Sequence, residues 1–123
     1  MRYAMIALGG ALGALARYEI AALIQARVPV GFPWGTFVVN VSGCLAMGIV
    51  MTLLDDRLVV NPHWRFLIPI GFIGAYTTFS TFELEAFRAN VEGAWLVGGA
   101  YVVGSVVVGY LALWAGVVLG RTL

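Results

Sequence analysis

Apolar residues fill four long stretches of the chain, separated by short segments that carry prolines and charges. The stretches run over about residues 3–26, 34–54, 66–87 and 94–120. Each matches the length of roughly 20 residues that an α-helix needs to cross a bilayer. The connections between them are too short to fold alone. The pattern therefore predicts an all-α membrane protein, with residues 1–123 forming a single domain of four transmembrane helices.

The composition agrees with this prediction and excludes several classes of protein. Hydrophobic residues make up 62% of the chain, charged residues 11%, and the mean hydropathy is +0.97, whereas charged residues approach ~25% in soluble domains. A net charge of +1 is too small for binding nucleic acid through its phosphates. One histidine, His63 in a connection, and one cysteine, Cys44 in an apolar stretch, assemble neither a nucleophile with its base nor a cysteine metal site. We therefore expect no enzyme.

The arginines barely distinguish the two sides of the membrane. Four spans place four arginines on one side and three on the other: Arg2, Arg57, Arg65 and Arg121 against Arg17, Arg27 and Arg88. Because the excess of basic residues sets orientation, this balance permits insertion both ways up. A fixed topology set by weak signals explains the count equally well.

Small residues at four-residue steps mark the faces on which helices can approach closely. Gly9 and Gly13 follow such a step in the first stretch, and Ala112, Gly116 and Gly120 do so in the fourth. In a membrane, small residues let helix backbones come into contact. This pattern predicts tight helix packing.

Hydroxyl residues gather at the centre of the third stretch. Residues 74–82 read GAYTTFSTF, with four hydroxyl groups within five positions. β-Branched threonines beside glycine form a poor helix centre, so we expect a break there. Irregular backbone at that depth is tolerated only inside protein or along a polar cavity, and its freed carbonyls could hold a small cation. In the alternative, the hydroxyls bond back to carbonyls one turn earlier in an intact helix.

Polar residues of the second and fourth stretches can extend this cluster. Thr36 and Asn40 lie one turn apart, and Tyr101, Ser105 and Gly109 recur every four residues. Each line presents hydrogen-bond donors from one helix face. Side chains with these donors suit a small anion that moves between weak sites.

Two phenylalanines after the cluster favour the same interpretation. Phe79 and Phe82 are three residues apart and share a helix face, and Glu85 extends that face toward the membrane surface. The edge of a phenyl ring carries the positive part of its quadrupole. Inward-facing rings could thus approach an anion without offering a full charge.

Three ordered motifs resemble the CrcB/Fluc fluoride channels of microbes over nearly the whole chain. They are GGALGALARY at 9–18, GTFVVNVSG at 35–43 and GFIGAYTTFSTF at 71–82. The resemblance implies an antiparallel, dual-topology homodimer in the cytoplasmic (inner) membrane. It also implies passive fluoride export through two pores, driven by the membrane potential without ATP, which protects the cell from fluoride toxicity. The implied partners are fluoride, the lipid bilayer and a second copy of the chain.

The resemblance also implies roles for individual residues. Arg17 lies near a vestibule, and the backbone carbonyls of Gly74 and Thr77 from both subunits hold a central structural sodium ion. Gly109 stands where some members carry a further hydroxyl, which interrupts the polar line. The residues implied for the fluoride pathway are Thr36, Asn40, Thr78, Phe79, Phe82, Glu85, Tyr101 and Ser105.

Two other functions stay open on the sequence. A small multidrug-type, proton-coupled transporter is also a four-span dimer, but it needs a carboxylate deep in its first helix, and Glu19 lies late in that stretch beside Arg17. A non-transporting membrane anchor subunit would explain the glycine-rich faces alone. Phe79→Ile, Phe82→Ile and Asn40→Asp distinguish the anchor from the channel, because an anchor tolerates all three.

Overall fold

The computed structural model describes residues 1–56 and 61–123, which contain helices and no strand. Three of these helices are long and apolar enough to cross a membrane, namely α1, α2 and α6, so the chain is a multi-pass membrane protein. Arg57, counted in the charge balance above, lies outside the described residues. The elements are α1 (Arg2–Gln25), α2 (Trp34–Asp56), α3 (His63–Arg65), the π-helix η1 (Phe66–Ile73), α4 (Gly74–Tyr76), α5 (Phe79–Val91) and α6 (Trp95–Thr122).

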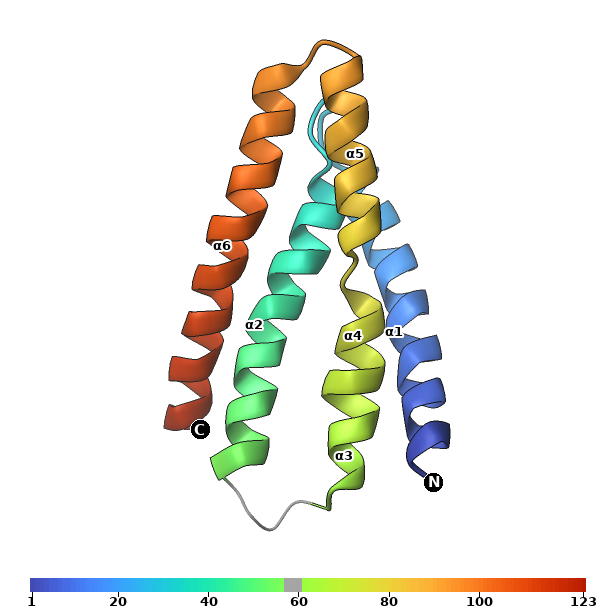
Figure 1. Ribbon diagram of the computed structural model, residues 1–123, viewed down its shortest axis with the longest axis vertical. Coiled ribbons are helices and arrows are strands. Elements are labelled where there is room, and N and C mark those ends of the chain that lie inside the picture. The colour runs from blue at the N-terminus through green and yellow to red at the C-terminus, as the bar shows by residue number, and fades with distance from the viewer. Residues whose placement is uncertain (57–60) are drawn as a thin grey trace.

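The elements run lengthwise beside one another, with both chain termini at the same end (Figure 1). Helix α2 packs along α6, whereas η1 packs along α1. The segment from α3 to α5 forms one interrupted column beside α1 and α2 (Figure 1). Residues far apart in sequence therefore meet where α2 and α6 adjoin the α5 part of this column.

Glycines bring the backbones of neighbouring helices into direct contact. A Cβ atom at Gly13 of α1 would overlap the carbonyl oxygen of Phe72 in η1, and one at Gly116 of α6 would overlap that of Leu45 in α2. In contrast, a Cβ at Gly10 would meet nothing within 4 Å. The close packing predicted from the small-residue steps is confirmed at two contacts, α1 against η1 and α2 against α6, which we call the glycine seams.

The first part of the third stretch is a π-helix, which the sequence analysis did not predict. Pro69 lies inside η1. The proline nitrogen carries no hydrogen, and the pyrrolidine ring clashes with the carbonyl four residues earlier in an α-helix. A π-helix, with its longer hydrogen-bond spacing, replaces the regular α-helix here. Pro69 was the available signal for this departure.

The predicted break in the third stretch is confirmed. Helix α4 ends at Tyr76, and α5 begins at Phe79. Between them Thr77 (φ −81°, ψ 154°) and Thr78 (φ −146°, ψ 117°) have extended backbone. The break lies part-way along the column of Figure 1, which places non-helical backbone among the surrounding helices.

Candidate functional site

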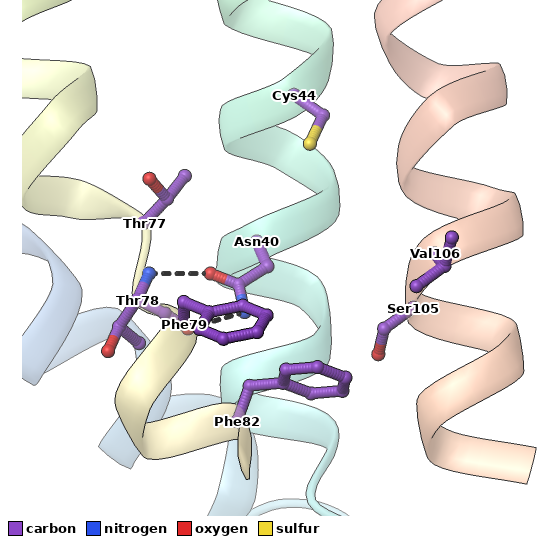
Figure 2. Close-up of a pocket in the computed structure, with 8 residues that line it drawn as sticks. All are labelled: Asn40, Cys44, Thr77, Thr78, Phe79, Phe82, Ser105 and Val106. Carbon is purple, nitrogen blue, oxygen red and sulfur yellow. Dashed lines mark hydrogen bonds between the residues drawn. The ribbon is translucent and has the colours of Figure 1, made fainter. Parts of the chain in front are cut away.

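The Asn40 side chain of α2 holds the break in place. Its Oδ1 accepts a hydrogen bond from the Thr78 amide at 2.8 Å, and its Nδ2 donates to the Thr78 carbonyl at 3.0 Å (Figure 2). This reciprocal pair satisfies two backbone groups that would be costly to leave unpaired in a membrane. Because a carboxamide carries two N–H donors, one remains for another partner.

The same bonds release two backbone carbonyls from their usual partners. In a continuous helix the Thr78 amide would pair with the Gly74 carbonyl, and the Thr81 amide with that of Thr77. The Thr78 amide donates to Asn40 instead, and the Thr81 amide donates to the Thr78 hydroxyl at 3.4 Å, so that Thr78 caps α5. Within residues 1–56 and 61–123, the carbonyls of Gly74 and Thr77 therefore lack the amide partners that a continuous helix would give them.

Thr77 behaves as the intact-helix alternative expected, although Thr78 does not. The Thr77 hydroxyl donates to the Ile73 carbonyl at 3.1 Å, one turn earlier. The Thr78 hydroxyl instead donates to the Thr81 hydroxyl at 3.0 Å, in the following turn. Two adjacent threonines thus stabilise opposite sides of the same break.

A cavity of about 260 Å³ lies beside the break, between α2, α5 and α6. Figure 2 shows the rings of Phe79 and Phe82 lying across the front of α2, with Ser105 on α6 beside them. The ring centroids are 5.8 Å apart. Phe82 is only 5% exposed, whereas Phe79 is 74% exposed. All the lining residues are uncharged: Asn40, Cys44, Thr77, Thr78, Phe79, Phe82, Ser105 and Val106.

Ser105 contributes a hydroxyl without a partner to this cavity. Its Oγ is buried and makes no hydrogen bond within the described part of the chain. A buried polar atom left unpaired costs about 1–3 kcal/mol. An acceptor in the cavity would remove that cost, because the Ser105 hydroxyl can donate to it.

Glu85 forms a second polar cluster with two hydroxyls from α2 and α6. The Thr36 hydroxyl donates to Glu85 Oε1 at 2.8 Å, and the Tyr101 hydroxyl donates to Oε2 at 2.7 Å. Hydrogen bonds to a carboxylate are among the stronger kinds. Thr36 and Tyr101, which the sequence analysis expected to act as hydrogen-bond donors, therefore both donate to one carboxylate.

Arg17 lines a second cavity, of about 330 Å³, which also contains Thr36, Thr78 and Glu85. The Arg17 Nε is buried and makes no hydrogen bond among the described residues. Thr78 lines both cavities. Thr78 therefore lies between a cavity lined by one basic and one acidic side chain, Arg17 and Glu85, and a cavity whose lining is uncharged.

The sequence profile of the family described as "CrcB-like protein, Camphor Resistance (CrcB)" matches residues 4–117 of the chain. The chain belongs to the CrcB family. The resemblance found in the three motifs is thereby confirmed.

This CrcB-family chain is also similar to proteins named "Fluoride-specific ion channel FluC". It is 53% identical to the one from Solibacter usitatus, over 98% of this chain and 99% of the relative. It is 50% identical to that of Acidobacterium capsulatum (98% and 97%) and 44% identical to that of Nitratidesulfovibrio vulgaris (95% and 94%). The similarity therefore extends over almost the full length of these proteins.

Cys44 and Thr81 are among the lining residues of this CrcB-family chain to which the sequence analysis gave no place in the pathway. Cys44 lines the uncharged cavity and lies beside Gly109, where an added Cβ would be 3.5 Å from the Cys44 Sγ. Thr81 lines the second cavity with Arg17. The available signal was spacing, because Cys44 is one turn after Asn40 and Thr81 is one turn before Glu85.

Proposed function

We propose that this CrcB-family chain is a passive fluoride channel that exports cytoplasmic fluoride across the inner membrane. The observation that carries the proposal is the uncharged cavity beside the break, where the Phe79 and Phe82 rings, the Asn40 carboxamide and the unpaired Ser105 hydroxyl meet. The name shared by the relatives supports a channel and gives no support to an enzyme.

The cavity lining suits transient contact with a dehydrated small anion. Asn40 has one N–H donor beyond the bond to Thr78, and Ser105 has a free O–H donor. The ring edges add partial positive charge. With no fixed cation in the lining, each contact is weak enough for the ion to leave, as conduction requires.

The second cavity serves as the vestibule of this pathway. The Arg17 guanidinium attracts anions to the entrance, where the opposing charge of Glu85 is stabilised by the hydroxyls of Thr36 and Tyr101. Thr78, which lines both cavities, is the step between them. The hydrogen bonds from Thr36 and Tyr101 fix the Glu85 side chain, so that the polar lining of the second cavity near Thr78 keeps one conformation.

The functional unit is an antiparallel homodimer of four-span, dual-topology subunits with two pores. The interrupted column from α3 to α5 supplies the fourth span beside α1, α2 and α6. The exposure of Phe79 supports a partner subunit, because the side of the uncharged cavity formed by this ring is otherwise open. The nearly even distribution of arginines supports insertion both ways up.

A structural sodium ion joins the two breaks at the dimer interface. The Gly74 and Thr77 carbonyls of each subunit would hold it, since the Thr78 and Thr81 amides bond elsewhere. Carbonyl oxygens are hard ligands that suit a small hard cation. Gly74 is exposed in the single chain, so a second copy can approach it. The ion would supply positive charge that stabilises the break.

Reconstituted vesicles test the proposal directly. Vesicles loaded with potassium fluoride or potassium chloride receive valinomycin, and electrodes record anion release. We expect fast fluoride release without any imposed proton gradient, and much slower chloride release. Fluoride release no faster than from loaded vesicles that contain no protein would overturn the channel. Fluoride release that requires a proton gradient would favour the proton-coupled transporter.

A further inference from the structure

Phe32 is an inward-facing ring in the short connection between α1 and α2. The residues just before it face outward, because Val30 is 100% exposed and Gly31 is also exposed. Gly31 has φ +130°, a conformation that residues with a side chain rarely adopt. This turn directs Phe32 back onto the buried cluster of Phe82, Ala86 and Tyr101.

Hydrogen bonds fix the backbone around Phe32. Gln25, the last residue of α1, donates from Nε2 to the Phe32 carbonyl at 3.3 Å and accepts from the Gly35 amide at 3.2 Å. The Trp34 amide also donates to the Phe32 carbonyl, at 2.9 Å. One side chain thus ties the connection to the ends of both helices and fixes the backbone from which the Phe32 ring extends.

The Phe32 ring continues a series of edge-to-face aromatic contacts that starts at Phe82 in the uncharged cavity. The centroids of Phe82 and Tyr101 are 5.0 Å apart at an interplanar angle of 71°, and those of Tyr101 and Phe32 are 5.3 Å apart at 79°. Tyr101 is 0% exposed between them. We name Phe82, Tyr101 and Phe32 the aromatic column.

Two interactions define the orientation of the Tyr101 ring. Its hydroxyl is bonded to Glu85, and its ring lies against Phe82 and Phe32. The ring is held at one end by its Cβ atom and at the other by its bonded hydroxyl, so the motion that remains is rotation about the axis through these two points. The edge-to-face contact with Phe32 therefore limits this rotation, and with it the angle at which Tyr101 meets Phe82.

We propose that Phe32 is a positioning residue for anion conduction, which orients Phe82 through Tyr101. The proposal rests on the proposed function. An aliphatic side chain of similar size at position 32 would fill the space, but it would lack the ring quadrupole that favours edge-to-face geometry. The orientation of Phe82, rather than the filling of the connection, is then what depends on residue 32.

The test compares Phe32→Leu, which removes the ring, with Phe32→Tyr, which retains it. Phe87→Leu is the control, because it makes the same change at a ring on α5 that is 64% exposed and lies outside the aromatic column. Fluoride release is measured in vesicles. In parallel, the ¹⁹F NMR resonance of Tyr101 is followed in protein labelled with 3-fluorotyrosine and assigned through Tyr101→Phe.

Phe32→Leu should lower fluoride release about two- to ten-fold, as the loss of an edge-to-face pair implies, and should shift the Tyr101 resonance. Phe32→Tyr should restore both readings, and Phe87→Leu should change neither. If Phe32→Leu aggregates on size-exclusion chromatography, Phe32→Met carries the same expectations.

Unchanged release and resonance in Phe32→Leu, or equal losses in the leucine and tyrosine variants, would overturn the positioning role. Wild-type protein without fluoride release would overturn the proposed function itself. The two failures are therefore distinguished by the wild-type measurement.

Discussion

The glycine seams and the break solve opposite packing problems. At the seams, backbone contacts backbone, and a Cβ at Gly13 or Gly116 would overlap a carbonyl oxygen of the neighbouring helix. At the break, two residues have extended backbone, and about 260 Å³ of space lies beside them. The comparison indicates that irregular backbone can persist inside a membrane helix bundle when the regular helices around it are held together by close backbone contacts.

The largest expected effect comes from disrupting a seam. Gly13→Leu forces a side chain against the Phe72 carbonyl, and we expect a destabilisation of about 3 kcal/mol or more, with aggregation in detergent. The matched control is Gly10→Leu on the same helix, where an added Cβ meets nothing within 4 Å. Size-exclusion chromatography and thermal unfolding compare the two. Equal stability of both variants would contradict the assignment of Gly13 to a tight seam.

A change at the break should lower conduction strongly and affect folding less. Asn40→Asp keeps the acceptor for the Thr78 amide, but it loses the donor to the Thr78 carbonyl and places an anion in the path. An ionised aspartate about 4 Å from a fluoride ion repels it by roughly 4 kcal/mol at an effective dielectric constant near 20, so we expect fluoride release to be at least about hundred-fold slower. Vesicle release measures it, with chromatography to verify the assembly. Wild-type release would exclude Asn40 from the pathway.

Phe82→Ile and Phe79→Ile separate the packing role of a ring from its proposed role in conduction. Both variants should lower fluoride release about ten-fold, because the aromatic edge is lost. The dimer should still form in both. Since Phe82 is buried and Phe79 is exposed in the single chain, only Phe82→Ile should also lower the unfolding temperature of detergent-separated protomers. Normal release from both variants would favour the membrane anchor.

The smallest effect should come from Ser105→Ala. The Ser105 hydroxyl makes no hydrogen bond among the described residues, so its removal should leave thermal stability equal or slightly higher. Fluoride release should fall about three- to ten-fold, as expected for the loss of one hydrogen bond to an anion. A clear loss of stability would show that the hydroxyl has a structural partner.

Part of the site could be predicted because it depends on local composition. The dense hydroxyl cluster predicted the break, since threonine and serine compete with helical hydrogen bonds wherever they gather. The pathway residues shared helix faces, and the structure brings five of them, Asn40, Thr78, Phe79, Phe82 and Ser105, around one cavity. Their roles in conduction stay predictions for the variants above.

Other features depended on neighbours that local pattern does not reveal. Glu85 was expected on the helix face of the two phenylalanines, but its hydrogen bonds to Thr36 and Tyr101, which come from two other helices, were not predicted. In the sequence, Cys44 is one of many apolar residues of the second stretch, whereas in the structure it lines the uncharged cavity. Phe32 belongs to a short connection in the sequence, whereas in the structure it contacts the fully buried ring of Tyr101.

The amino-acid sequence alone was enough to predict that the chain enters a membrane, which helix faces can pack tightly, and where the third stretch is not helical. These properties follow from hydropathy, residue size and backbone preference, which act within a few residues. The group that stabilises the helix break became visible in the three-dimensional arrangement, because the Asn40 carboxamide that pairs with Thr78 comes from another helix, 38 positions away. A hydrogen bond between helices depends on their relative placement, and that placement results from all their contacts together.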